Sequence, residues 1–123
     1  VRKPERAQRI GIEQALEESP YIEQAMVYTE GHAVAGLIVP SFERLKVWCE
    51  QNGVTFSLPA VLTDSRVLDF YLSEIEKRLS RMQHYEQVKK FRLLPEGFTP
   101  ENDLLTPTLK LKRGNILRFY LIK

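Results

Sequence analysis

A lysine near the end of a proline-stiffened segment is the residue in this sequence whose setting most suggests chemistry. Residues 105–113 read Leu-Thr-Pro-Thr-Leu-Lys-Leu-Lys-Arg, and Pro107 bars a helix, so extended backbone is predicted over residues 104–112. Residues 104–123 carry five basic and no acidic side chains, and this excess of positive charge attracts anions. Two interpretations stay open on these grounds. Lys110 and Lys112 are solvated residues that protect a strand edge, or Lys110 acts on an anionic substrate.

The same stretch resembles the C-terminal lysine motif of the adenylate-forming superfamily, whose general form is Pro-x-Thr-x-Ser-Gly-Lys-x-x-Arg. It is more similar still to the version of long-chain acyl-CoA synthetases, Leu-Thr-Pro-Thr-Leu-Lys-Leu-Arg/Lys-Arg. Thr108 and Leu109 stand where the general motif has Ser and Gly. Lys110 stands at the catalytic lysine of the motif, and Arg113 stands at its trailing arginine.

The resemblance extends from residue 12 to residue 113 with matching order and spacing. Beyond the lysine motif it covers Ile-Glu-Gln-Ala-Leu at 12–16, Ser-Pro-Tyr-Ile-Glu-Gln-Ala-Met-Val at 19–27, Ala-Gly-Leu-Ile-Val-Pro at 35–40, Tyr-Glu-Gln-Val-Lys-Lys-Phe at 85–91 and Leu-Leu-Pro at 93–95. Arg9 departs from the family, which usually has Pro-x-x-Ile-Glu there, and Asp103-Leu104 replaces a glycine that commonly precedes the motif. Residues 1–9 are therefore interpreted as a divergent or foreign start, and no hinge or coenzyme-gate residue is assigned to them.

The resemblance implies that residues 1–123 form a single C-terminal lid domain of a larger long-chain fatty acid–CoA ligase. In such an enzyme a fatty acid and ATP form an acyl-adenylate, and coenzyme A then displaces AMP after the lid has rotated. Lys110 is the implied catalytic residue of the first of these steps.

The implied partner is an N-terminal adenylation domain of the same chain, which supplies the pockets for fatty acid and ATP. Mg²⁺ is expected beside ATP in that missing domain. The fragment alone is expected to bind no cofactor and to be inactive. A cytoplasmic location is also implied, and peripheral association with a membrane is left open.

Five basic residues are candidate contacts to the phosphates of ATP or coenzyme A. Arg113 and Lys112 follow the motif lysine directly, whereas Lys77, Arg78 and Arg81 lie on the polar side of the longest predicted helix. A solvated helix face is the alternative explanation for these last three residues.

The charge distribution admits one competing function. Residues 76–123 carry eleven basic and five acidic side chains, although the whole chain has a net charge of only +2. A basic half also suits a nucleic-acid-binding or protein-interaction module without catalysis. Exposed aromatic side chains among the basic residues would favour that alternative. Phe91, Phe119 and Tyr120 occupy positions expected to pack, however, so no nucleic-acid partner is predicted.

Thiol and imidazole side chains indicate no metal site. Cys49 lies among apolar positions of a predicted helix and is interpreted as a buried core thiol. His32 and His84 have no cysteine or second histidine at ligand spacing. No apolar run reaches the ~18–20 residues that span a bilayer.

The hydrophobic pattern predicts an α+β fold in the order α-β-β-α-α-β-loop-α, with a small, mainly antiparallel three-stranded sheet packed with helices. Helices are expected at 9–18, 41–53, 64–82 and 113–121, and strands at 21–28, 33–39 and 88–94. Ser41 and either Thr63 or Asp64 are the expected N-caps, and Gly53 is the expected C-cap.

We further expect the Lys110 ammonium to be exposed, without a fixed partner, on a poorly restrained segment. A lysine that must enter another domain's active site cannot be committed to an ion pair at home, because breaking that pair opposes closure. Leu111 and the apolar face of residues 113–121 are expected to be buried and to anchor the segment. The alternative is that Lys110 pairs with Glu96 or Glu101 and serves stability.

Overall fold

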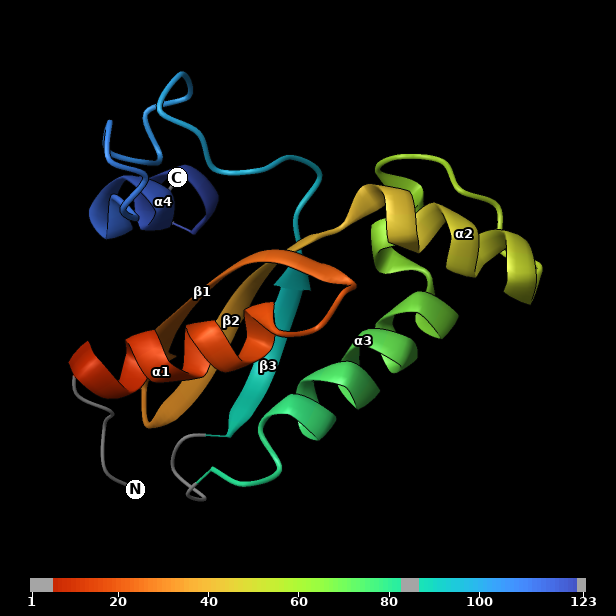
Figure 1. Ribbon diagram of the computed structural model, residues 1–123, viewed down its shortest axis with the longest axis horizontal. Coiled ribbons are helices and arrows are strands. Elements are labelled where there is room, and N and C mark those ends of the chain that lie inside the picture. The colour runs from red at the N-terminus through yellow and green to blue at the C-terminus, as the bar shows by residue number, and fades with distance from the viewer. Residues whose placement is uncertain (1–5, 83–86, 122–123) are drawn as a thin grey trace.

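The computed structural model describes residues 6–82 and 87–121 and confirms the predicted α+β class and element order (Figure 1). The elements are α1 (Arg6–Glu17), β1 (Ile22–Glu30), β2 (Ala33–Pro40), α2 (Phe42–Asn52), the 3-10 turn η1 (Ala60–Thr63), α3 (Ser65–Arg78), β3 (Val88–Leu93) and α4 (Arg113–Tyr120). Helix α1 begins three residues earlier than the hydrophobic pattern indicated, and the strand bounds differ from the predicted ones by one or two residues.

The three strands form one sheet in the order β1-β2-β3. Strands β1 and β2 pair in antiparallel register over the longer of the two ladders, and Gly31 takes a positive φ of 64° in their two-residue turn. Strand β3 joins β2 in parallel. A parallel pair needs a long crossover, and α2, η1 and α3 supply it.

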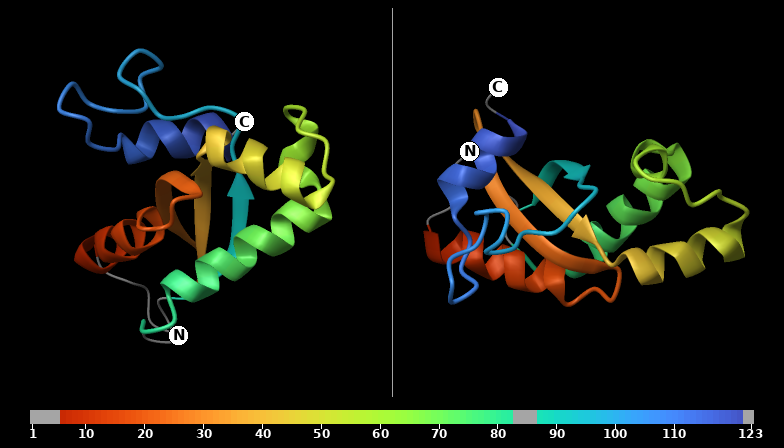
Figure 2. Two further views of the ribbon diagram at one scale, coloured as in Figure 1. Left: turned by 45° about the vertical axis from the view of Figure 1, so that its right-hand side comes forward. Right: turned by 90° about the horizontal axis from the view of Figure 1, so that it is seen from above.

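The sheet is covered on both faces, so the central strand β2 is buried along nearly its whole length. Figure 2 shows α4 and the segment before it on one side of the sheet, with α1 on the other. Successive strand residues alternate between the faces, which gives two hydrophobic cores. The first core includes Ile12, Leu16, Ala25, Val27, Leu45, Tyr71 and Ile75. The second, smaller core is formed by Met26, Leu37, Val39, Leu94, Phe98, Leu104, Leu105, Ile116 and Tyr120.

The predicted helix caps are confirmed. The Ser41 side chain accepts the Arg44 N–H at the start of α2, and Gly53 ends that helix with a φ of 69°. The Asp64 side chain accepts the Arg66 N–H at the start of α3. Each of these contacts satisfies a backbone group that helix geometry leaves unpaired.

Helix α3 ends at Arg78, four residues before the predicted Met82. The Gln87 side-chain amide donates to the carbonyl oxygens of Leu79 (2.7 Å) and Met82 (3.2 Å). These bonds satisfy carbonyl groups beyond the helix, so the chain can turn away toward β3 although Leu79 is still buried.

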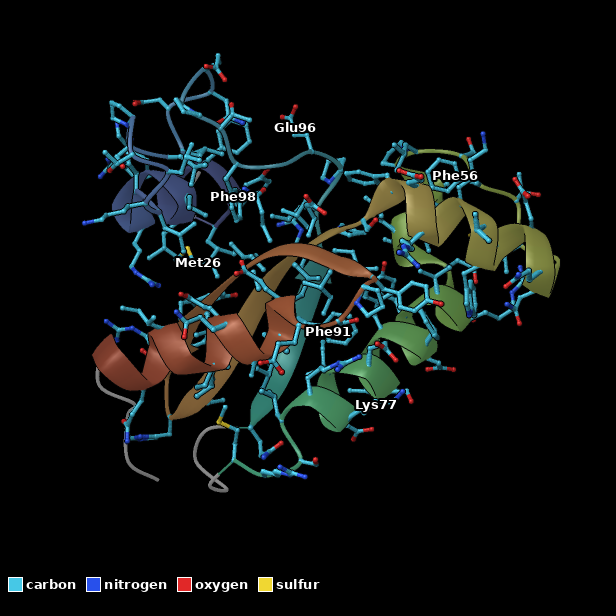
Figure 3. All side chains as sticks on the ribbon, viewed as in Figure 1. Met26, Phe56, Lys77, Phe91, Glu96 and Phe98 are labelled. Carbon is cyan, nitrogen blue, oxygen red and sulfur yellow. The ribbon has the colours of Figure 1, made fainter. Side chains whose placement is uncertain are left out.

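A side-chain amide fastens the chain where it leaves the sheet after β3. Gln24 accepts the Phe98 N–H at 2.7 Å and donates to the Phe98 carbonyl oxygen at 3.0 Å, as a neighbouring strand would. Phe98 and Met26 lie between the sheet and the C-terminal segment in Figure 3. A Cβ atom at Gly97 would lie 2.9 Å from the Gln24 Oε1 atom, so glycine allows this close approach.

Candidate active site

The lysine motif forms a tight loop in the structure, so the prediction of extended backbone was wrong. Leu105 and Leu111 pair at the base of the loop. The Leu109 N–H donates to the Thr106 carbonyl oxygen at 2.8 Å, and the Thr106 N–H donates to the Lys110 carbonyl oxygen at 2.8 Å. Pro107 excludes a helix as expected, but its fixed φ also suits the second position of a reverse turn, and the chain folds back there.

Leu109 closes this loop in the left-handed conformation, with a φ of 66°. It stands where the general motif has glycine, the residue that adopts this conformation without strain. For a residue with a Cβ atom the left-handed region costs about 1–2 kcal/mol. The Thr106 hydroxyl supports the conformation by accepting the Lys110 N–H at 3.0 Å, and it lies 3.1 Å from the Thr108 hydroxyl.

The Lys110 side chain is exposed, as predicted. Within residues 6–82 and 87–121 its ammonium makes no hydrogen bond or ion pair, so neither Glu96 nor Glu101 holds it. The backbone of the loop is not poorly restrained, however, because four hydrogen-bonding contacts cross it. A fixed loop therefore presents an ammonium that remains available to an anion from outside the domain.

The anchoring of the loop follows the prediction in part. Ile116 and Tyr120 of α4 are buried in the second core, while Leu111 is only half-buried. Phe119 (57% exposed) and Leu121 lie at the surface, so Phe119 packs only in part, through an edge-on contact of its ring with that of Tyr120. The buried residues Ile116 and Tyr120 lie one turn apart on one face of the short helix α4.

A cavity of about 670 Å³ lies beside the loop, between it, α1 and the start of β1. Its lining residues are Ile10, Glu13, Gln14, Glu17, Glu23, Gln24, Ala25, Leu105, Leu109, Lys110, Leu111 and Arg113. Partial burial raises the pKa of Glu17, against the opposing effect of the hydrogen bond from the Ala25 N–H, and the nearby charges of Glu13 and Glu23 raise it further.

Arg113 is paired inside the domain. Its guanidinium donates two bonds of 2.7 Å to the two carboxylate oxygens of Glu13 in α1. Glu13 is buried and also accepts the Val27 N–H at 2.8 Å, whereas Arg113 is partly exposed. Glu13 was not singled out from the sequence. The only signal for it was its place in the Ile-Glu pair of the family resemblance.

Lys112 is also paired, with a carboxylate oxygen of Asp103. Asp103 has a φ of 66°, and Asn115 of α4 donates to its carbonyl oxygen (2.8 Å) and its carboxylate (3.1 Å). Asp103 occupies the place where a glycine commonly precedes the motif, and its positive φ explains why glycine suits that position. Lys112 and Arg113 thus fix the loop from its C-terminal side.

Of the other three basic candidates, Lys77 and Arg78 lie at the end of α3 and Arg81 follows that helix, and α3 lies away from the lysine loop (Figure 1). Lys77 and Arg78 approach the buried carboxylate of Glu74 at 3.5 and 4.0 Å. Ser19 also donates to Glu74, at 2.7 Å. Arg81 is exposed beyond the end of the helix. The structure therefore divides the five candidates between two regions of the domain.

The remaining candidates are the cysteine and the two histidines. Cys49 is fully buried in the first core, and burial raises the pKa of its thiol. His32 is exposed, and His84 lies outside the described residues. In the part of the chain that the structure describes, no three His, Cys, Asp or Glu side chains gather in a way that could hold a metal ion. None of its helices is both long and apolar enough to cross a membrane.

No family profile matches the chain, but individual proteins do. Long chain acyl-CoA synthetase 5 of Arabidopsis thaliana is 30% identical over 115 residues, which is 89% of this chain and 17% of that protein. Long-chain-fatty-acid–CoA ligase 5 of Mus musculus is 32% identical over 113 residues, 89% of this chain and 16% of that protein. The chain belongs to the long-chain acyl-CoA synthetase family.

The chain spans about one sixth of the length of these acyl-CoA synthetases. Its fold also matches a solved adenylation domain, that of a carboxylic acid reductase from Segniliparus rugosus in complex with AMP and a co-purified carboxylic acid. The TM-score is 0.68 at 23% identity, over 89% of this chain and 16% of the other. The family resemblance predicted from the sequence is thus confirmed by similarity over 89% of this chain.

Proposed function

We propose that this chain is the C-terminal lid of a long-chain fatty acid–CoA ligase and that Lys110 enters the active site of an N-terminal adenylation domain. The observation that carries the proposal is the free Lys110 ammonium on an internally hydrogen-bonded loop. The names of the similar synthetases support the substrate class, and the carboxylic acid reductase domain holds AMP and a carboxylic acid in its own structure.

In the first half-reaction a carboxylate oxygen of the fatty acid attacks the α-phosphorus of ATP, and the bond from that phosphorus to pyrophosphate breaks. Two anions must approach each other for this to happen. A lysine ammonium that contacts both offsets their repulsion in the transition state. Lysine suits the task because it is a compact charge on a flexible stem. ATP, the fatty acid and the Mg²⁺ that accompanies ATP belong to the N-terminal domain.

In the second half-reaction the sulfur of coenzyme A attacks the acyl carbon, and AMP leaves. We propose that the lid rotates between the two steps and that its α3 end then faces coenzyme A. Arg81 is the best-placed phosphate contact there, because Lys77 and Arg78 are already near Glu74. Lys112 and Arg113, which are paired with Asp103 and Glu13, hold the Lys110 loop in place.

The half-reactions can be measured separately in the full-length enzyme. Lys110→Ala should slow the formation of acyl-adenylate from fatty acid and ATP but leave thioester formation from pre-made acyl-adenylate almost unchanged. Equal losses in both steps would refute the assignment. The isolated chain should release no AMP from ATP and palmitate. We place the enzyme in the cytoplasm, and a flotation assay with vesicles tests for peripheral membrane association.

A further inference from the structure

Leu109 combines two unfavourable features. Its φ of 66° lies in the left-handed region, where glycine is favoured, and its side chain is 67% exposed. It belongs to neither of the two hydrophobic cores. Glycine would relieve the strain and remove the exposed apolar surface, so we expect leucine to stabilise this domain less than glycine would.

The backbone around Leu109 fixes the direction of its side chain. Its own N–H is bonded to Thr106, and the next residue, Lys110, is bonded through its N–H and its carbonyl group to Thr106 as well. Leu109 and Lys110 also line the same cavity. A movement of the loop that delivers the lysine therefore delivers the leucine beside it.

The intermediate of the proposed reaction needs protection from water. An acyl-adenylate is a mixed anhydride of a carboxylic and a phosphoric acid. If water attacks its acyl carbon, the bond from that carbon to the AMP oxygen breaks, fatty acid and AMP are released, and a proton goes to the solvent. The ATP is then consumed without a thioester, so an apolar group that excludes water from the acyl carbon prevents the loss.

Building on the function proposed above, we propose that Leu109 is a water-excluding residue that covers the acyl-adenylate when the loop is in the active site. Its apolar side chain, exposed in the free domain, becomes buried against the intermediate. The strain at Leu109 persists because the hydrogen-bonded loop imposes the conformation, and strained residues of this kind gather at functional sites.

The experiment compares Leu109→Gly, Leu109→Asn and Leu109→Met in the full-length enzyme. Acyl-adenylate is formed on the enzyme from palmitate and ATP without coenzyme A, and AMP release by hydrolysis is followed. Glycine and asparagine both tolerate the left-handed conformation but lack an apolar side chain. They should each raise hydrolysis about tenfold, as expected for losing the burial of one leucine. Methionine is apolar and should keep hydrolysis near the wild-type rate.

Measurements of thermal stability and of acyl-adenylate hydrolysis distinguish a water-excluding role of Leu109 from a structural one. In thermal unfolding of the isolated chain, Leu109→Gly should raise the melting temperature, because it relieves strain. If glycine and asparagine changed only this temperature and left hydrolysis within about twofold of wild type, the water-excluding role would be overturned. A parallel assay of Lys110→Ala tests the proposed function itself. Loss of adenylate formation in that variant with unchanged hydrolysis in Leu109→Gly would reject the role of Leu109 alone.

Discussion

The Arg113 guanidinium and the Glu13 carboxylate are joined by two hydrogen bonds of 2.7 Å, although 100 residues separate them in the chain. Glu13 also accepts the Val27 N–H, so one carboxylate connects α1, β1 and the first residue of α4. Arg113 follows Lys110 by three residues. The pair therefore sets where the lysine loop lies against the rest of the domain.

Removing one member of this pair should destabilise the domain strongly. Glu13→Ala leaves the Arg113 guanidinium and the Val27 N–H without their partner, and we expect a loss of about 2–4 kcal/mol in the free energy of unfolding. Urea unfolding followed by the fluorescence of Trp48, which stacks on Phe70, measures it.

Glu30→Ala is the matched control, because Glu30 pairs with Lys90 at 3.2 Å and both side chains are more than half exposed. The loss there should stay below about 0.5 kcal/mol. Similar losses for the buried and the exposed pair would contradict the anchoring role of Glu13.

Lys110→Ala should leave the stability of the isolated domain unchanged within about 0.5 kcal/mol, because the ammonium has no partner among the described residues. In the full-length enzyme the same change should slow adenylate formation about 10²–10³-fold. Urea unfolding measures the change in the free energy of unfolding, and a pyrophosphate-release assay measures the rate of adenylate formation. Lys110 would be a structural residue if the variant lost stability in proportion to activity.

Tyr71 should make the stability of the domain depend on alkaline pH. Burial raises the pKa of its phenol, whose hydroxyl donates to the Tyr21 carbonyl oxygen at 2.8 Å. The phenol therefore stays protonated in the folded chain at pH values where it ionises in the unfolded chain. The contribution of the protonated phenol to the free energy of unfolding is complete below about pH 10. Above that value it falls by up to about 1.4 kcal/mol per pH unit.

Tyr71→Phe tests this dependence. At pH 8 the variant should be less stable than wild type by about 1–2 kcal/mol, because the Tyr21 carbonyl loses a donor. Above pH 10 the difference should shrink, because only the wild type loses the contribution of residue 71. Urea unfolding at several pH values gives both curves, and a constant difference between them would show that the Tyr71 phenol does not titrate as expected.

Arg81→Ala should raise the KM for coenzyme A in the thioester step about fivefold and leave adenylate formation unchanged. The reason is the exposed position of Arg81 beyond the end of α3, on the region proposed to face coenzyme A. Lys46→Ala in α2 is the control, because Lys46 is an exposed helical lysine outside that region. Equal KM values for wild type and Arg81→Ala would remove this contact from the proposal.

Hydrophobic periodicity and capping residues were enough to predict the element order, both β-strands of the hairpin and the caps at Ser41, Gly53 and Asp64. These signals are local, since each depends on a few neighbouring residues. The end of α3 was missed because it depends on Gln87, which comes after the helix in the chain. Apolar spacing continued through Leu79 and Met82, so periodicity alone predicted a longer helix.

Features of the candidate site that depend on a single residue were predictable from the sequence. Features that depend on a contact between two distant residues were not. The exposure of Lys110 followed from the lack of acidic residues after Asp103. The loop conformation was missed, because Pro107 excludes a helix but suits both an extended strand and a turn. Pairing of Arg113 with Glu13 depends on the packing of α1 beside the C-terminal segment, and no local pattern reports such a contact.

The interior is separated into two cores, and we expect the smaller core to open without disrupting the larger one once the Arg113–Glu13 pair has broken. Release of the smaller core exposes the amide hydrogens of the segment that carries Lys110, such as the Lys112 N–H bonded to the Leu104 carbonyl group. The helices on the opposite face keep their own buried contacts during such an opening. Hydrogen exchange should therefore be faster in the segment that carries Lys110 than in α1 and α3. In the proposed function, the segment that changes its environment is the one that packs against the smaller set of buried side chains.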